Sequence, residues 1–459
     1  MKFNLETIGK KIQSFFDKDL VAKVARKTKF VRRESPLNGR VFLQAMVFGC
    51  IEKPTVTLKH WAQVCLDLGV TITPQGFDER INEYSLEFLR AMFDHAMKWF
   101  RNDIPLPVDI LQQFTAINIV DSSTKSLPDN LRAEYPGTGG NGPAASLKVQ
   151  LVFEFLLGNL EQIALRPGRE PDQKYRAYLD IVKKGSLNLL DLGYFCLDAF
   201  KEVMDRQAYF LTRYLYGTGL STPRGEPIDL LPGLQEATTS IVDREVRLGA
   251  GHQLPCRLIA LKVPQEVADR RRQKARETAQ RKGRTPSKAR LALLDWTIFV
   301  TNVPAALLSP EQVAVLYRVR WQIELVFKLW KSYCGLKRIA GVRKERVLTE
   351  LYGKMIGIVL THFLIAPIRM PEGSGANREI SPVQVRKILG RFARELDKAL
   401  HQLSEFVNVL AEMFEHIAQF GFKQKRRKEP NVCHLLTLIS TIFELEENCD
   451  MEYSLSTLF

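Results

Sequence analysis

The sequence predicts an α/β protein with a mixed, α+β type of sheet that is interrupted by a β-rich insertion and flanked by helical regions. Apolar residues recur at helical spacing up to about residue 105, β-branched residues alternate with polar ones from 106 to 213, and the last third is strongly helical. The predicted regions are a helical N-terminal domain suited to DNA binding (1–105), the first part of the core (106–213), the insertion (214–299), the second part of the core (300–375) and a helical C-terminal region, a candidate for dimerisation (376–459).

Composition and charge restrict the class of protein. The 459 residues are 45% hydrophobic and 25% charged, which is typical of a folded globular chain with two to four domains. Lysine and arginine total 66 against 51 acidic residues, which gives a net charge of +15. Such a charge favours a polyanionic partner, and nucleic acid is the leading candidate.

Cysteine usage and hydropathy indicate a cytoplasmic protein. The seven cysteines are scattered and form no CxxC pair, so neither a disulfide framework nor a zinc site is predicted. The first residues lack the apolar segment of an export signal, and the longest apolar run, around 355–367, is too short to span a bilayer. We therefore expect no export and no membrane partner.

Two adjacent helices are predicted in the N-terminal region. The first covers about 58–69, and the second begins after Thr73, an N-cap residue, with Pro74 at its first position. This pattern fits a DNA-binding helix-turn-helix, but it favours an ordinary helical hairpin, because the motif has no strict sequence signature.

The core region predicts three strands, a helix and a fourth strand. The strands are expected at 115–124, 146–158, 161–168 and 187–195, and the helix at 172–185. This order excludes a simple Rossmann repeat. In the insertion, short strands at 240–248 and 256–263 precede the most basic stretch of the chain, 269–290. That stretch is a solvated charged segment or, as we favour, a contact to backbone phosphates that offset its self-repulsion.

Two acidic residues lie in apolar strand segments. Asp121 ends the run AINIV, and Asp191 interrupts LNLLDLGYF. Each could cap a turn, but burial disfavours a carboxylate charge, and a divalent metal is a natural partner for two such groups.

One long helix is predicted from Ser309, the N-cap, to about residue 338. On it Tyr317, Arg320, Glu324 and Lys331 fall on one arc beside an apolar stripe. A charged row is often only a salt-bridged surface. Here it borders the buried face, so a carboxylate is presented among cations next to the core.

This row closely resembles the signature Y-x2-R-x3-E-x6-K of the DDE transposases of bacterial insertion sequences, in their family-four branch. Tyr317, Arg320, Glu324 and Lys331 match every spacing, and Asp191, Gly193 and Tyr194 match the D-x-G-Y/F segment that carries the family's second Asp. The resemblance covers roughly residues 110–365. It implies an RNase H-like catalytic core interrupted by the insertion.

The resemblance also implies the site residues and the cofactor. Asp121, Asp191 and Glu324 would hold two divalent ions, Mg²⁺ with Mn²⁺ as a substitute, that activate the nucleophile and stabilise the leaving oxygen. The phosphate-binding candidates on the signature helix and elsewhere are Tyr317, Arg320, Lys331, Lys148 and Arg213. Trp296 stands where related enzymes stack a flipped base, and a core tryptophan is the alternative.

The function implied is a DNA transposase that cuts the ends of its element and joins them to target DNA, by cut-and-paste and with a hairpin intermediate as one route. Its partners would be double-stranded DNA, as terminal inverted repeats and target, and a second copy of the chain in a synaptic complex, in the bacterial cytoplasm at the nucleoid. Two alternatives are a domesticated or inactive DNA-binding protein and an RNase H-like nuclease without strand transfer.

Overall fold

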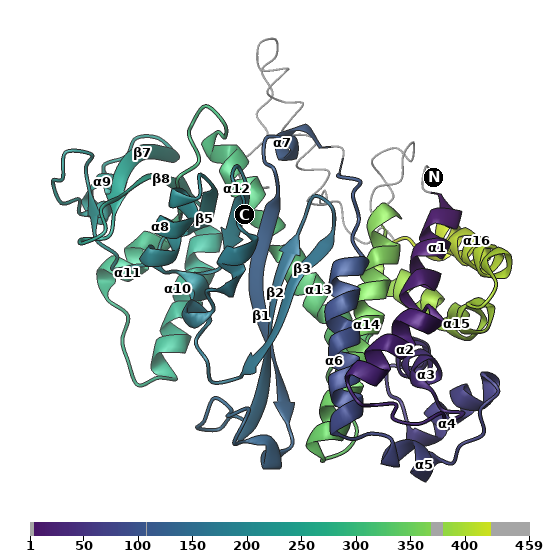
Figure 1. Cartoon of the computed structure of the whole chain (residues 1–459). Helices are drawn as coiled ribbons and strands as arrows, with labels where there is room; N and C mark the ends of the chain where they lie inside the picture. The colour runs from purple at the N-terminus through teal and green to yellow at the C-terminus, as the bar shows by residue number, and fades with distance from the viewer. Residues whose placement is uncertain (1–3, 107, 369–379, 424–459) are drawn as a thin grey trace.

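A single nine-stranded sheet runs through the middle of the molecule, with a helical body on one side of it (Figure 1). The computed structural model describes residues 4–106, 108–368 and 380–423. The strands are β1 (Ile117–Leu127), β2 (Ala145–Glu154), β3 (Asn159–Pro167), β4 (Leu187–Leu190), β5 (Tyr209–Arg213), β6 (Leu220–Ser221), β7 (Ile241–Leu248), β8 (Leu254–Lys262) and β9 (Trp296–Thr301). Their order in the sheet is β3-β2-β1-β4-β5-β9-β8-β7-β6.

The first five strands have the RNase H-like arrangement. β1, β2 and β3 form an antiparallel meander, and β4 and β5 are added in parallel on the other side of β1. A parallel connection needs a crossover segment, and the chain supplies one before β4 and another, with a helix, before β5. The predicted mixed α/β fold is confirmed.

The insertion extends this same sheet. β9 pairs with β5 on one side and with β8 on the other, and β7 and β6 follow outward, all antiparallel. The strands predicted in the insertion are therefore present, and they continue the core sheet through β9.

The other regular elements of the described residues are helices. The α-helices are α1 (Leu5–Phe15), α2 (Lys18–Lys27), α3 (Gly39–Glu52), α4 (Leu58–Asp67), α5 (Pro74–Glu79), α6 (Glu83–Trp99), α7 (Asp109–Gln112), α8 (Leu197–Asp205), α9 (Leu230–Gln235), α10 (Gln265–Gln280), α11 (Lys288–Ala292), α12 (Pro310–Val319), α13 (Trp321–Ser332), α14 (Lys344–Ile365), α15 (Pro382–Ala399) and α16 (Leu403–Phe420). The 3₁₀ turns are η1 (Asp129–Leu131), η2 (Asp172–Lys174), η3 (Ala177–Ile181), η4 (Leu192–Tyr194), η5 (Leu293–Asp295) and η6 (Ala366–Ile368).

The helices from the two ends of the chain form one body. α16 packs on α1, α15 packs on α3, and α14 runs between α3 and α6 (Figure 1). The N-terminal region, the C-terminal region as far as residue 423 and α14 therefore share one apolar core. The rest of the predicted C-terminal region, 424–459, lies outside the described residues.

α14 is the one described helix that is long and apolar enough to cross a membrane. Within the protein, 89% of its most apolar stretch is buried. Its composition thus matches its place at the centre of the helical body.

Two predicted helices differ from the structure. The segment 172–185, predicted as a helix, forms the short turns η2 and η3, because its apolar Tyr175, Tyr178 and Leu179 insert into the core beside the sheet. The helix predicted after Ser309 is divided at Arg320 into α12 and α13. At this junction the backbone bonds shorten to three-residue steps, from Arg320 N–H to Tyr317 and from Ile323 N–H to Arg320.

The predicted helix pair near residue 70 is present as α4 and α5. Thr73 caps α5 through Gly76 N–H, and Pro74 occupies its first turn, as predicted. α5 has six residues, and its Phe77 is buried against Trp61. Whether the pair binds DNA stays a prediction.

A buried polar ladder fixes the register of the central strands. The Asn118 side chain on β1 donates to Asn188 Oδ1 on β4 at 3.0 Å, and Asn188 donates to the carbonyl of Tyr209, the first residue of β5, at 2.9 Å. Both asparagines are essentially inaccessible to solvent. A slip by one residue would break these bonds and turn every side chain of the strand to the other face.

The buried carboxyl of Asp397, on α15, predicts a pH dependence of stability. Burial raises its pKa from 3.8 to about 7, and Gln44 donates to it at 2.9 Å. A carboxyl whose pKa is raised by folding stabilises the fold most below pH 3.8, and this contribution is lost as the pH rises to about 7. We expect the loss to approach roughly 1.4 kcal/mol per pH unit at most.

Asp397→Asn should therefore raise the free energy of unfolding more at pH 8 than at pH 5, because only part of the loss has occurred at pH 5. Urea denaturation at both pH values measures the difference. An equal effect at the two pH values would show that Asp397 keeps its charge in the folded protein.

Candidate active site

Two carboxylates meet at one edge of the sheet. Because β1 and β4 are parallel and Val120 pairs with Leu190, the next residues, Asp121 and Asp191, leave the two strands side by side. Asp121 continues β1, whereas Asp191 is the N-cap of the turn η4. Residues far apart in the chain are thus brought together by strand register.

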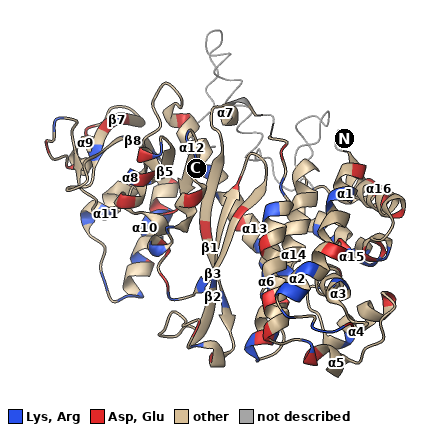
Figure 2. Ribbon diagram, viewed as in Figure 1, with Lys and Arg blue, Asp and Glu red and all other residues tan. Residues whose placement is uncertain are grey.

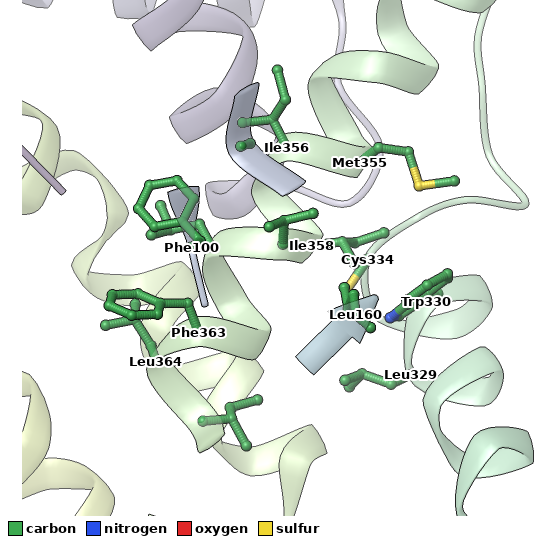
Figure 3. Packing of buried hydrophobic residues seen from close by; sticks show 14 of the residues in the cluster. Phe100, Leu160, Leu329, Trp330, Cys334, Met355, Ile356, Ile358, Phe363 and Leu364 are labelled. Atoms are coloured by element: carbon green, nitrogen blue, oxygen red, sulfur yellow. The ribbon is translucent and has the colours of Figure 1, made fainter. Parts of the chain in front are cut away.

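The third carboxylate, Glu324, comes from α13, which packs against β1. α12 begins with a capping box between Ser309 and Gln312, which anchors the helix pair at its start. Farther along, Leu329 and Trp330 of α13 are buried in the same cluster as residues of α14 (Figure 3), and Trp330 Nε1 donates to His362 Nε2 at 2.8 Å. The apolar face of α13 therefore positions Glu324 over the strand end.

Arg320 joins two of the carboxylates. Its guanidinium lies 3.4 Å from Asp121 Oδ2 and 3.0 Å from Glu324 Oε1. Burial raises the pKa of Asp121 to about 6; the Ser122 N–H and Arg320 oppose this rise, and the negative charges of Asp191 and Glu324 add to it. Asp121 is therefore close enough to the other two carboxylates to be repelled by them, and Arg320 offsets part of this repulsion.

A second arginine forms an ion pair with Asp191. Arg213, at the end of β5, lies 3.6 Å from Asp191 Oδ1 and also hydrogen-bonds with the Tyr317 side chain. The Tyr317 hydroxyl lies 3.4 Å from the carbonyl of Leu190, at the end of β4. Burial raises the pKa of Tyr317, so this hydroxyl stays protonated. Arg213 and Tyr317, both predicted site residues, are thus part of the site.

Two of the three carboxylates open into a hollow of about 410 Å³. Asp121 and Glu324 line it together with Lys331, the last residue of the signature row, and with Lys328 and Lys337, which were not predicted. Burial lowers the pKa of Lys331, and the neighbouring Lys337 lowers it further. The hollow thus joins a carboxylate group to a group of ammonium ions.

The donor set is suited to hard divalent cations. Asp121, Asp191 and Glu324 offer only carboxylate oxygens, which Mg²⁺ and Mn²⁺ prefer. In the part of the chain that the structure describes, no three acidic, His or Cys side chains already converge as a ready-made metal cluster. Arg320 lies between two of the donors, so a cation that binds them would displace it from at least one.

Lys148, a predicted phosphate contact, is directed into the protein. It is 7% exposed, and its ammonium donates to Asp172 Oδ1 at 2.9 Å and to the Glu170 carbonyl at 2.6 Å. Its charge is therefore neutralised by Asp172, which argues against a role in DNA contact.

Asp172, which had no signal in the sequence, accepts hydrogen bonds from three side chains near the site. Besides Lys148, Ser122 Oγ and Gln150 Nε2 donate to the same oxygen, at 2.9 and 3.0 Å. Tyr194, in the turn that begins at Asp191, donates to Gln150 Oε1. This network links the residue after Asp121 to the turn that carries Asp191.

Trp296, predicted either to stack on a base or to belong to the core, is 7% exposed and packs in the core beneath the insertion. By contrast, Trp321, on α13 three residues before Glu324, is 55% exposed. The structure therefore favours the core alternative for Trp296.

The basic stretch 269–290 forms α10, a loop and α11 (Figure 2). Arg271 donates to Thr297 Oγ1 on β9, and Arg272 pairs with Asp269 and Asp295. Lys274 and Arg276 are exposed, and no carboxylate of the described chain pairs with them. α10 thus uses two arginines to attach to the sheet and presents others to solvent.

Comparison with known proteins identifies relatives of this chain. Residues 112–360 match the family model described as the transposase DDE domain. The chain is 26% identical to the transposase for insertion sequence element IS1151 of Clostridium perfringens, over 96% of this chain and 98% of that protein. It is 26% identical to the transposase for IS231F of Bacillus thuringiensis subsp. israelensis, over 95% and 96%. A cryo-EM structure of a piggyBac transposase synaptic complex with hairpin DNA aligns with 96% of this chain and 90% of its own, with a TM-score of 0.46 and 10% identity.

Loss of the Asp172 charge should destabilise the protein. Asp172→Asn leaves the buried Lys148 ammonium without its counter-charge, and we expect the free energy of unfolding to fall by about 2–3 kcal/mol, less than for a fully buried pair. The double variant Asp172→Asn, Lys148→Met should recover part of this loss. Denaturant unfolding of the four proteins of the cycle gives the coupling, and additive effects would exclude the interaction.

Trp296→Ala should behave as a core truncation, with a loss of about 3–5 kcal/mol in the free energy of unfolding. Trp296→Phe should lose less, because most of the apolar contact remains. Thermal melting tests both variants. An unchanged melting temperature in Trp296→Ala would contradict a core role and restore the stacking hypothesis.

Proposed function

Because the chain belongs to the family of DDE-domain transposases, we propose that Asp121, Asp191 and Glu324 are the residues with which it cuts and joins DNA. The prediction of a DNA transposase is confirmed by this membership. The observation that supports the catalytic assignment is that Asp191, at the neighbouring strand end, and Glu324, on α13, both lie within the electrostatic reach of Asp121.

We propose that these carboxylates hold two divalent ions, Mg²⁺ in the cell. When bound, such ions stabilise charge on phosphoryl oxygens and lower the pKa of a water or hydroxyl nucleophile. The chain prepares the site by holding Asp121 and Asp191 on adjacent strand ends and Glu324 on a helix anchored in the core. Burial of Asp121 limits the water around its carboxylate.

The cations at the site have distinct proposed tasks. Arg320 has a planar guanidinium suited to two-point contact with a phosphate, and we propose that it turns from its carboxylate partners to the DNA backbone. Lys331 provides a point charge in the same hollow. Arg213 contacts Asp191 and hydrogen-bonds with Tyr317, and we propose that these two residues orient Asp191 and offer polar groups to a phosphate on that side.

We propose that α10 binds duplex DNA next to the site. Its Arg271 is close enough to Arg213 for the two charges to interact, and Arg213 contacts Asp191. A series of cations therefore leads from the exposed side chains of α10 to the carboxylates. Phosphate contacts of this kind supply affinity without sequence preference.

We further propose that two copies of the chain act together on two terminal inverted repeats and transfer the cut element to target DNA, in the bacterial cytoplasm at the nucleoid. In cut-and-paste transfer, with or without a hairpin on the flanking DNA, we propose that the same three carboxylates carry out both the cutting and the joining of the DNA. An inactive DNA-binding protein or a nuclease without strand transfer would differ in the products of the assay below.

Asp121→Asn, Asp191→Asn and Glu324→Gln should each abolish cleavage and leave DNA binding largely intact. We expect at least the roughly hundredfold loss that removal of an outer-shell metal partner can cause. The assay combines protein, Mg²⁺ and a duplex carrying one end of the chain's own element, and gel electrophoresis resolves nicks, hairpins and transfer products.

Asp180→Asn, at an exposed carboxylate of η3, is the matched control and should cleave at the wild-type rate. Near-normal turnover in any of the three site variants would refute the catalytic assignment. Binding without any cleavage by the wild type would support the inactive alternative, and nicks without transfer would support the nuclease.

The contribution of α10 can be measured by salt dependence. If Lys274 and Arg276 each contact a phosphate, the double alanine variant should reduce the slope of log affinity against log salt concentration by about 2. The control is Lys183→Ala, Lys184→Ala, which removes two exposed charges before β4, at the opposite strand end from Asp191. Equal slopes for wild type and α10 variant would rule out this contact.

A further inference from the structure

Three ammonium groups line the hollow beside the catalytic carboxylates. They belong to Lys328 and Lys331 on α13 and to Lys337, which follows that helix. Within the described residues, no carboxylate forms an ion pair with any of them. Like charges gathered in one recess repel one another, and an anion in the recess would relieve that repulsion.

Lys337 is carried by a loop of fixed shape between α13 and α14. Gly335 has a φ of 72°, and a Cβ at this residue would lie 2.0 Å from the carbonyl oxygen of Pro54, so only glycine fits this close approach. Lys125, four residues after Asp121 on β1, donates to the carbonyl of Lys337 at 3.2 Å. The loop is therefore attached to the helical body and to the strand that bears Asp121.

A buried ion pair on α14 forms hydrogen bonds with the backbone of the same loop. Lys354 and Glu350 are both 0% exposed and lie 2.8 Å apart. Lys354 donates to the carbonyls of Gly335 and Arg338, at 3.0 and 2.5 Å, and Glu350 accepts from the N–H of Ala340 at 3.2 Å. The pair thus binds backbone groups on both sides of Lys337.

Such a pair is costly to bury, and replacing a buried ion pair with apolar residues of similar volume is often neutral or stabilising. Its hydrogen bonds all go to the loop, so its specific effect is to hold the loop backbone in one place. The side chain so placed is Lys337, exposed and directed into the hollow.

We propose that Lys337, positioned by the buried Lys354–Glu350 pair, forms with Lys328 and Lys331 a binding site for a DNA backbone phosphate next to the one that is cut. This inference rests on the proposed function, because it takes the substrate to be DNA. Each lysine acts as a point charge on a phosphate oxygen, and the site sets how the strand enters the carboxylate end of the hollow.

The test is the salt dependence of DNA binding, measured in EDTA with a duplex carrying one end of the element. Lys337→Ala should reduce the slope of log affinity against log salt concentration by about 1, the value for one phosphate contact, and Lys337→Arg should retain it. Lys183→Ala removes an exposed charge elsewhere and should leave the slope unchanged. An unchanged slope in Lys337→Ala would overturn the phosphate site.

The positioning role is tested by Glu350→Gln combined with Lys354→Met, which removes both buried charges and leaves neither unpaired. We expect this variant to fold, as circular dichroism would show. Its slope of log affinity against log salt concentration should fall by the same amount as in Lys337→Ala. Adding Lys337→Ala to it should cause no further loss. A full slope in the folded double variant would overturn the positioning role.

A parallel cleavage assay in Mg²⁺ separates this inference from the proposed function. If the wild type cleaves and Lys337→Ala keeps the full slope, only the phosphate site is wrong. If the wild type does not cleave, the catalytic proposal is wrong, and the slopes still report on the lysines.

Discussion

The parallel pairing of β1 with β4 is the constraint on which the site depends. Asn118 and Asn188 bond to each other inside the sheet, and this fixes the register in which Val120 lies beside Leu190. One residue farther, the two strands must end in adjacent carboxylates. Burying a polar pair in the middle of a sheet costs free energy unless the two groups bond to each other. Asn118 and Asn188 do so, and only one alignment of the strands allows this bond.

Positive charges of two arginines then reduce the repulsion among the carboxylates. Arg320 and Arg213 approach from the divided helix and from β5, and each contacts an acidic group at the strand ends. The helix is divided at Arg320, whose guanidinium lies against Asp121 and Glu324, while the apolar face of α13 stays buried in the core. Charge balance and packing thus act on the same few residues.

The sequence allowed much of this site to be predicted, for reasons that differ by residue. Asp121 and Asp191 follow apolar strands, but each alone could cap a turn. The fixed spacing around Glu324 carries the family resemblance, and that resemblance joined the three residues into one predicted site. Asp172 and Lys337 have no such spacing, because their partners come from distant strands and from α14. The predicted helix at 172–185 was wrong because tertiary packing of its tyrosines outweighs helical propensity.

The shared strand β9 also limits how this architecture can vary in evolution. Because β9 pairs with β5 and β8 and leads directly into the helix that carries the signature, the insertion is no exchangeable module. Its removal would expose the edge of β5 and disconnect the catalytic helix. Tolerated change in length must therefore concentrate at the outer edge, in the connections around β6 and the loop between α10 and α11, where no strand of the core takes part.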